Sequence, residues 1–411
     1  MSTKELTNSI TLAGWQATGL ALAAAAMANR AGLGALVGAA LLAPIVYALV
    51  RLRSHAPQAP STAELVGSTL GLRAAAAAGI LQVTGYALIA VTAAQAFGLM
   101  WVPLDVTDGL GGTVQVNPWL WSLWAVAAIV VAAVLVFALP GRVAASLAAV
   151  LALGGLLIQF YYGLAVVAHG LSDTAPEQAV GDGSTTGLAI AGMLATLAVT
   201  PAGFEVVTTR TRRGSSNGWP MGLAMAVVAV VALVVWWACQ YVAAAAGSLD
   251  GSSLGIAVNG FYGDTGTKIV NIGAAMIVFG ALLALLWGIG AVTEGLDVRV
   301  PADAVFGGIV LVMALLAVAL IHGGWSPGYI GGLVLFALYA VVMAANGRIP
   351  GDSVVSWWLR LVMPVVFAAV VLLPLVWAEF DPSVVVPVVV AAVVIAAAVA
   401  AAAVGTRSRA D

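Results

Sequence analysis

The sequence predicts an all-α polytopic membrane protein with about 12 transmembrane helices, and three observations predict this class. Of the 411 residues, 63% are hydrophobic and only 8% are charged, whereas soluble domains carry about 25% charged residues. The mean hydropathy is +1.09, and a chain so poor in charge cannot cover a surface exposed to water. The third observation is a series of apolar segments of about 20 residues, the length at which a helix crosses a bilayer.

Twelve segments have the length and composition of a membrane-spanning helix, and turn formers such as Pro140-Gly141 separate them. The first six are 10–29, 32–50, 74–101, 120–139, 143–169 and 186–207. The second six are 221–246, 269–293, 304–321, 329–345, 357–377 and 384–404. The last segment is nearly pure alanine and valine, a composition that suits a peripheral helix facing lipid.

The apolar run that follows Lys4 has two interpretations. Such a run after a basic residue is typical of a secretory signal peptide. However, Gln16 and Thr18 lie in its middle, and the rest of the chain already requires insertion as a multispanning protein. We therefore interpret this run as the first transmembrane helix.

The basic residues predict the orientation of the chain. With a cytoplasmic N-terminus, 13 of the 15 lysines and arginines fall inside, and only Arg30 and Lys268 fall outside. The inner residues are Lys4, Arg51, Arg53, Arg73, Arg142, Arg210, Arg212, Arg213, Arg299, Arg348, Arg360, Arg407 and Arg409. Because cytoplasmic loops are enriched in basic residues, this split indicates a multi-pass protein of the cytoplasmic membrane with both termini inside.

Composition and residue counts argue against several function classes. The net charge of -2 and the lack of long basic stretches indicate no nucleic-acid partner. The single cysteine, Cys239, allows no internal disulfide. The three histidines lie in loops or at segment ends, without paired carboxylates or a nucleophile motif. We therefore expect no enzyme activity, no metal and no cofactor, and a membrane-embedded enzyme is kept as the alternative from another class.

Two of the segments carry signs of a broken helix. The first places the small and polar residues 16–19 inside an apolar run. In the sixth, Pro201 removes a backbone donor and Gly203 eases departure from the helix. Glu205 follows two residues later and is the one acidic side chain that this segmentation places inside a span. Ionisable groups at such depth are costly and commonly functional.

The two interrupted segments each open a block of five segments. The blocks are 10–169 and 186–345, and 357–404 forms two peripheral helices. Because five is odd, the second block enters the membrane from the opposite side. Interrupted helices at matching places in inverted blocks indicate a central transport site. Close helix packing also explains either break alone, but their matching positions and Glu205 favour a site.

The motifs of the first and sixth segments resemble those of the amino acid–polyamine–organocation transporters. Members typically have a Gly-Ser-Gly-like break in the first helix, to which Ala17-Thr18-Gly19 is similar, and a Gly-Phe-Glu motif in the sixth, here Gly203-Phe204-Glu205. The chain departs from the family at Ala17 and at Arg210-Thr211-Arg212-Arg213, where many relatives have acidic residues. The resemblance implies the LeuT-like fold, a five-plus-five inverted repeat, and secondary transport of an amino acid or related amine by alternating access.

Broken helices suit an amino acid, because one half-helix exposes carbonyl acceptors and the other exposes amide donors. We expect one side of the substrate site to consist of Gln16, Ala17, Thr18 and Gly19, and the other of Pro201, Ala202, Gly203 and Phe204, a placement that the resemblance also implies. Further candidates for substrate contact are Gln82 and Tyr86, four residues apart in the third segment, and Trp287 in the eighth. For these three, ordinary helix packing is an equally good interpretation.

Glu205 has two interpretations. It either takes up and releases a proton or changes charge to unlock a gate, or it is structural. In the structural case it caps the second half-helix or pairs with an arginine, since Arg210 lies about 8 Å further along a helix. The sequence does not decide between them.

Sodium coupling is disfavoured. Sodium-coupled relatives use serine or threonine hydroxyls on the eighth helix, and this chain has neither between Ile272 and Val292. We therefore expect proton coupling or exchange. The expected partners are a small-molecule substrate and the lipid bilayer. The residues do not distinguish import from export, and they identify neither the substrate nor the oligomeric state.

Overall fold

The computed structural model describes residues 12, 14–27, 33–57, 59, 61–102, 104–106, 114–172, 203–208, 219–246, 253–295, 301–323, 326–349 and 382–407. These ranges are helical apart from one hairpin, which confirms the predicted all-α class. The first elements are α2 (Gly14–Ala25), α3 (Leu33–His55), α4 (Thr62–Leu70), α5 (Leu72–Leu99) and the antiparallel strands β1 (Leu104–Val106) and β2 (Val114–Val116). The later elements are α6 (Pro118–Ala138), α7 (Gly141–Ser172), the 3₁₀ helix η3 (Phe204–Thr208), α9 (Trp219–Ala246), α10 (Ser253–Gly295), α11 (Ala302–His322), α12 (Gly328–Asn346) and α14 (Pro382–Arg407).

Eight of the described helices are long and apolar enough to cross a membrane: α5, α6, α7, α9, α10, α11, α12 and α14. They coincide with eight predicted segments, and α2 and α3 coincide with the first two. The predicted eleventh segment, 357–377, and residues 186–202 of the sixth lie outside the described residues. The total of 12 spans and the boundaries of the two blocks therefore stay predictions.

Local sequence signals set several helix ends. The Asn117 side chain begins α6 by accepting hydrogen bonds from the N–H groups of Trp119 and Leu120 at 3.0 and 3.2 Å. Pro118 fits the first turn because its missing N–H is not needed there. Gly71 separates α4 from α5 with a φ of 87°, a conformation that glycine adopts without steric penalty.

The helix α10 is longer than the predicted span at 269–293. It covers 253–295 and kinks at Gly263, whose φ is 62°. Thr267 Oγ1 donates a hydrogen bond to the Gly255 carbonyl at 3.2 Å. These residues would be about 18 Å apart in a straight helix, so the segment before the kink folds back on the segment after it. The polar residues around the kink lower the local hydropathy, which hid this outer segment from the prediction.

Helices α7 and α10 pack closely through small residues. A Cβ atom at Gly155 would collide with the carbonyl oxygen of Gly273. Across the same interface, Gln159 Nε2 donates to the Val270 carbonyl at 3.0 Å. Small residues let the backbones of membrane helices approach, so that dispersion contacts and interhelical hydrogen bonds hold them together. The pair forms a wall against which α2 packs.

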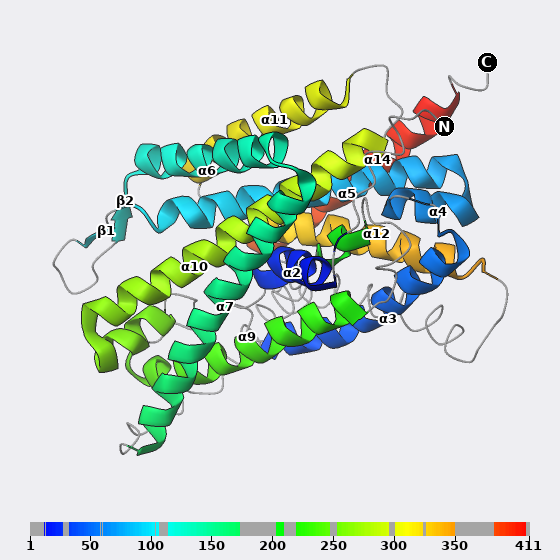
Figure 1. Cartoon of the computed structure of the whole chain (residues 1–411). Coiled ribbons are helices and arrows are strands. Elements are labelled where there is room, and N and C mark those ends of the chain that lie inside the picture. The colour runs from blue at the N-terminus through cyan, green and yellow to red at the C-terminus, as the bar shows by residue number, and fades with distance from the viewer. Residues whose placement is uncertain are drawn as a thin grey trace.

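The helices around α2 enclose the interior of the protein. Helix α2 contacts α7, α9, α10 and η3, and α5 contacts α10 and α12. Figure 1 shows α6 and α11 side by side on one flank, with the β1–β2 hairpin and α4 at opposite ends of the bundle. The outer helices α11 and α14 expose large apolar side chains, including Leu311, Leu315 and Val393, each 62% exposed. Such surfaces are typical of helices that face lipid.

Candidate functional site

The backbone is not helical at Gly203, where the sequence predicts a break in the sixth segment. This residue has a φ of 98°, which residues with a side chain rarely adopt, and the chain continues as the five-residue η3. The Val206 N–H donates to the Gly203 carbonyl at 2.9 Å and closes the first turn of η3. The predicted site residues Pro201 and Ala202 lie outside the described residues.

The carboxylate of Glu205 is fully buried, with an exposed fraction of 0%. The Tyr339 hydroxyl, from α12, donates a hydrogen bond of 2.6 Å to Oε2 of Glu205. The same hydroxyl accepts a hydrogen bond of 3.2 Å from the N–H of Gly203. A buried polar group is costly unless it is hydrogen-bonded, and bonds to an ionised group are the stronger ones. Tyr339 therefore stabilises both the carboxylate and the backbone at the break.

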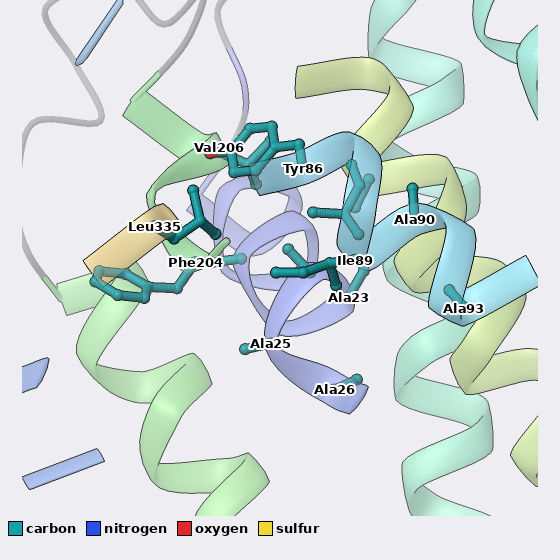
Figure 2. Packing of buried hydrophobic residues seen from close by; sticks show 14 of the residues in the cluster. Ala23, Ala25, Ala26, Tyr86, Ile89, Ala90, Ala93, Phe204, Val206 and Leu335 are labelled. Carbon is teal, nitrogen blue, oxygen red and sulfur yellow. The ribbon is translucent and has the colours of Figure 1, made fainter. Parts of the chain in front are cut away.

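Of the two predicted residues of α5, Tyr86 reaches the same carboxylate, and Gln82 contacts Tyr86. Gln82 and Tyr86 are fully buried, and Gln82 Nε2 donates to the Tyr86 hydroxyl at 2.9 Å. The Tyr86 hydroxyl interacts in turn with Glu205. A Cβ atom at Gly288 of α10 would lie 2.7 Å from both the Tyr86 ring and the Val206 side chain. Glycine at this position thus lets the Tyr86 ring reach η3, and Figure 2 shows the ring beside Val206.

The predicted aromatic residues Phe204 and Trp287 are also buried in this region. Phe204 has an exposed fraction of 0%, and its ring lies 5.7 Å from the Tyr339 ring, centroid to centroid. Trp287 is 1% exposed on α10, next to Gly288. The structure thus brings Gln82, Tyr86, Gly203, Phe204 and Glu205 together and places Trp287 on the adjoining helix.

The break predicted at residues 17–19 of the first segment is wrong. Helix α2 is regular from Gly14 to Ala25. A Cβ atom at Gly19 would collide with Ala149 of α7, so this glycine serves close packing. Small residues are equally suited to a helix break and to close packing, and the sequence alone does not separate the two.

The polar residues of the first segment are satisfied away from Glu205. Gln16 Nε2 donates to Ser146 Oγ of α7 at 2.8 Å. Thr18 Oγ1 donates to the Gly14 carbonyl of its own helix at 2.9 Å, and Ala17 is buried. The structure therefore places Gln16, Ala17, Thr18 and Gly19 in the packing of α2 rather than at the break in the sixth segment.

The part of α2 that meets this break is its C-terminal end. A Cβ atom at Gly203 would lie 3.4 Å from the Ala24 side chain. Helix α2 ends at Ala25, and the chain continues as 3₁₀ helix through Met27. Figure 2 shows Ala25 and Ala26 on this end of α2, in the same cluster as Phe204. Ala24 lies about 9 Å beyond Thr18 along the helix, so the end of α2 rather than its middle meets the break.

The far end of η3 is tied to α4. Thr208 Oγ1 donates to the Glu205 carbonyl at 2.7 Å. It also lies 2.7 Å from Thr62 Oγ1 of α4, and both side chains are buried. Because the Thr208 hydroxyl donates to Glu205, Thr62 must donate to Thr208. The 3₁₀ helix is therefore anchored at both ends, by Tyr339 and by Thr62.

A second acidic residue lies outside the predicted spans, on α4. Burial raises the pKa of Glu64, and the Arg53 guanidinium opposes this rise. Arg53 itself donates to the Ala59 carbonyl. The two side chains belong to neighbouring helices, Arg53 to α3 and Glu64 to α4.

Tyr339 is the functional candidate that sequence reasoning missed. Between Ile330 and Val342, every residue except Tyr339 is glycine, phenylalanine or aliphatic. One hydroxyl in an otherwise apolar helix is a usable signal, because a buried hydroxyl requires a partner.

The described residues contain no group of three or more His, Cys, Asp or Glu that could hold a metal ion. The polar groups gathered at Glu205 are one carboxylate, one amide and two phenolic hydroxyls. Such groups can bind a ligand through hydrogen bonds and can hold or release a proton.

Solved structures share the fold of this chain. MhsT, in a crystal structure in complex with L-phenylalanine, is 16% identical, has a TM-score of 0.52, and the match covers 88% of this chain and 98% of that chain. A mutant of the manganese transporter from Eremococcus coleocola is 10% identical, has a TM-score of 0.59, and the match covers 97% of both chains. No protein-family model and no curated protein matches the sequence. These similarities confirm the LeuT-like fold.

Proposed function

We propose that the chain is a secondary transporter of the amino acid–polyamine–organocation family, carrying an amino acid or a related amine across the cytoplasmic membrane by alternating access. The observation that carries this proposal is the meeting of Ala24, at the end of α2, with the backbone break at Gly203. The buried carboxylate of Glu205 lies two residues beyond the break. Charged groups at such depth are costly, and in membrane proteins they commonly mark substrate and proton pathways.

The two helix ends supply the chemistry that an amino acid needs. The end of α2 carries a partial negative charge, which attracts an ammonium group. The amide donor at the break is the Gly203 N–H, which a ligand carboxylate would take over from the Tyr339 hydroxyl. An α-amino acid has both charges on neighbouring atoms, so a junction of two helix ends accommodates it.

The donor set at Glu205 favours an organic ligand over a metal ion. The two solved neighbours differ in this respect, since MhsT holds L-phenylalanine and the other is a manganese transporter. Manganese prefers several carboxylate, carbonyl or water ligands. Here one carboxylate faces two tyrosine hydroxyls, which are poor ligands for a divalent cation when protonated.

The structure of α10 supports proton coupling or exchange rather than sodium coupling. The residues of α10 nearest the break are Leu285, 3.1 Å from the Cβ position of Gly203, and Gly288, against Val206. Neither carries a hydroxyl that could bind sodium. Glu205 is the group that would carry the proton.

A contact between α3 and the end of α12 supports the proposed orientation. Arg51 Nη2 donates to the Ile349 carbonyl at 3.4 Å, so the ends of the second and tenth predicted segments lie on the same side. The positive-inside distribution assigns both ends to the cytoplasm.

Counterflow in proteoliposomes tests the carrier function. Vesicles containing purified protein are loaded with an unlabelled mixture of amino acids and diluted into a tritiated mixture. A carrier produces a saturable, transient accumulation of label that does not require sodium. A channel gives no such overshoot, because its flux does not exchange bound ligand.

The variant Glu205→Gln identifies the role of the carboxylate. We expect uptake by this variant to be independent of pH. The variant itself should still fold and insert into the membrane. Glu64→Gln is the matched control, since it makes the same chemical change outside the proposed site, and we expect it to retain uptake. Absence of counterflow in the wild type with every compound of the mixture contradicts the proposed function.

A further inference from the structure

A cavity of about 200 Å³ opens between the ends of α6 and α10 and the starts of α7 and α11. Its lining shares no residue with the proposed substrate site. It has room for about six water molecules at about 30 Å³ each. Because it lies where four helices end or begin, it is at the depth of the lipid headgroups. The positive-inside distribution assigns this end of the bundle to the cytoplasm.

The wall that α10 and α11 contribute to this cavity offers hydrogen-bond acceptors. Glu294, in the last turn of α10, and Asp303, in the first turn of α11, place two exposed carboxylates there. Thr293 is 1% exposed, and its hydroxyl donates to the Gly290 carbonyl at 2.9 Å, so its oxygen is left as an acceptor. The C-terminal end of α10 adds a partial negative charge. This wall therefore suits a cation that carries several N–H donors.

The wall that α7 contributes has the opposite charge. Helix α7 begins at Gly141, which lines the cavity, and Arg142 follows directly. The start of a helix carries a partial positive charge and binds phosphate groups, and the arginine adds a full charge. An acidic wall next to a basic rim complements a zwitterion in which an ammonium group and a phosphate lie close together.

An apolar side chain connects the cavity with the surface that faces lipid. Phe137 of α6 lines the cavity and is 69% exposed. Val134 and Val130 continue the exposed face of α6 at helical spacing. Helix α11 lies beside α6 (Figure 1). A ligand in the cavity can therefore extend an apolar part along these two helices.

Helix α11 has a shallow depression on the same side as Asp303. Residues 303, 307, 311 and 315 follow one another at four-residue steps, so they share a face of the helix. Among the described residues, no atom lies within 4 Å of the Cβ position of Gly307, whereas Leu311 is 62% exposed. The missing side chain leaves a furrow, here called the Gly307 furrow, between Asp303 and Leu311, which are about 12 Å apart along the helix. An acyl chain fits such a furrow.

We propose that the cavity binds a phospholipid whose headgroup ends in a primary ammonium, as in phosphatidylethanolamine, with an acyl chain in the Gly307 furrow. A primary ammonium has three N–H donors, which match the acceptors of Glu294, Asp303 and Thr293. The quaternary ammonium of phosphatidylcholine has no N–H donor, and the headgroup of phosphatidylglycerol has no positive charge. This lipid site is separate from the substrate site and does not depend on the identity of the substrate.

Native mass spectrometry of the delipidated full-length protein tests the headgroup preference. The probes are dioleoyl-phosphatidylethanolamine, its N-methyl and N,N-dimethyl derivatives, phosphatidylcholine and phosphatidylglycerol, all with the same acyl chains. We expect affinity to fall with each methyl group that replaces an N–H, by about tenfold over the series. Phosphatidylglycerol should bind no more tightly than phosphatidylcholine. Equal binding of all five lipids would mean that they only coat the apolar surface, and it overturns the site.

Substitutions place the preference at the proposed residues. Asp303→Asn and Glu294→Gln remove a charge at nearly constant size, and each should reduce the preference for phosphatidylethanolamine over phosphatidylcholine. Asp264→Asn is the matched control, an exposed carboxylate near the kink of α10, and it should leave the preference unchanged. Gly307→Leu fills the furrow and should weaken all five lipids alike. An undiminished preference in both Asp303→Asn and Glu294→Gln contradicts the proposal.

Competition experiments distinguish a lipid from smaller cations with the same charge. Ethanolamine, O-phosphoethanolamine and calcium chloride are added separately to the complex with dioleoyl-phosphatidylethanolamine, and none should displace the lipid when present at the same concentration. Displacement by any of them would make the cavity a site for a small cation or a free headgroup, which overturns the lipid site. Phosphatidylethanolamine should also raise the melting temperature of the wild type more than that of Asp303→Asn, because a ligand of the folded state stabilises it. An equal rise in both would contradict binding through Asp303.

Discussion

The Tyr339 hydroxyl donates a 2.6 Å hydrogen bond to Oε2 of Glu205 and accepts a 3.2 Å hydrogen bond from the N–H of Gly203. One side chain of α12 thus holds both the backbone break and the carboxylate beside it. Any movement of α12 away from η3 must break both bonds together. The relationship links the position of α12 to the charge and orientation of Glu205, which is the kind of link that an alternating-access cycle requires.

Tyr339→Phe is expected to lower the free energy of unfolding by about 1–3 kcal/mol, because it removes a donor to the buried carboxylate of Glu205 and the hydroxyl that accepts from the buried N–H of Gly203. Denaturant unfolding of the purified protein measures the change. Tyr329→Phe is the control on the same helix, because the Tyr329 hydroxyl has no hydrogen-bond partner among the described residues. Equal effects of the two substitutions would mean that the Tyr339 bonds do not stabilise the break.

Gly203→Ala is expected to destabilise the protein by about 1–2 kcal/mol, since a side chain at a positive φ clashes with its own backbone. The added carbon would also press on Leu285, 3.1 Å away. Gly222→Ala in α9 is the matched control, because nothing lies within 4 Å of its Cβ position. An α-helical Gly203 would give both variants the same small effect, and that result contradicts the observed break.

The contact between Gly19 and Ala149 predicts a rescue. Gly19→Ala should destabilise the protein and reduce uptake, because the new side chain collides with Ala149 of α7. Adding Ala149→Gly should restore both properties, since the pair of side chains is merely exchanged across the interface. If uptake stays low in the double variant while its stability recovers, Gly19 contacts the ligand, as the sequence first suggested.

The pKa of Glu64 predicts a dependence of stability on pH. Burial raises this pKa above its ordinary value of 4.5, against the effect of Arg53. The folded protein therefore binds this proton more tightly than the unfolded chain does. The resulting stabilisation is complete below the unfolded pKa and is lost as the pH rises through the folded pKa. Melting temperatures across this range should fall less steeply for Glu64→Gln, and an unchanged slope would remove Glu64 as the cause.

The sequence predicted the fold class and the break in the sixth segment because both have strong local signals. Apolar segments of spanning length indicate membrane helices whatever their neighbours are. Pro201 and Gly203 oppose a regular helix for reasons of backbone chemistry, and Glu205 has a high cost in lipid. These properties belong to single residues, so they are readable without knowledge of tertiary contacts.

The remaining features depend on contacts between distant segments. Ala24 meets Gly203 because α2 ends there, but a run of alanines gives no signal for the end of a helix. Gly19 looked like a break because packing against Ala149 requires the same small residue that a break does. Tyr339 is 134 positions from Glu205, and no local pattern joins them. The break that the sequence predicted at residues 17–19 therefore lies about two turns before the end of α2 that meets Gly203.

Accessibility of position 24 tests most directly whether the ligand lies where α2 meets Gly203. Ala24→Cys is prepared with Cys239→Ser, and the rate of labelling by a small methanethiosulfonate reagent is measured in proteoliposomes. We expect slow labelling that compounds active in counterflow suppress further, because they occupy the junction. Gly14→Cys, at the open start of α2, should be labelled at the same rate with and without them. Labelling at position 24 that is indifferent to every such compound would contradict the proposed site.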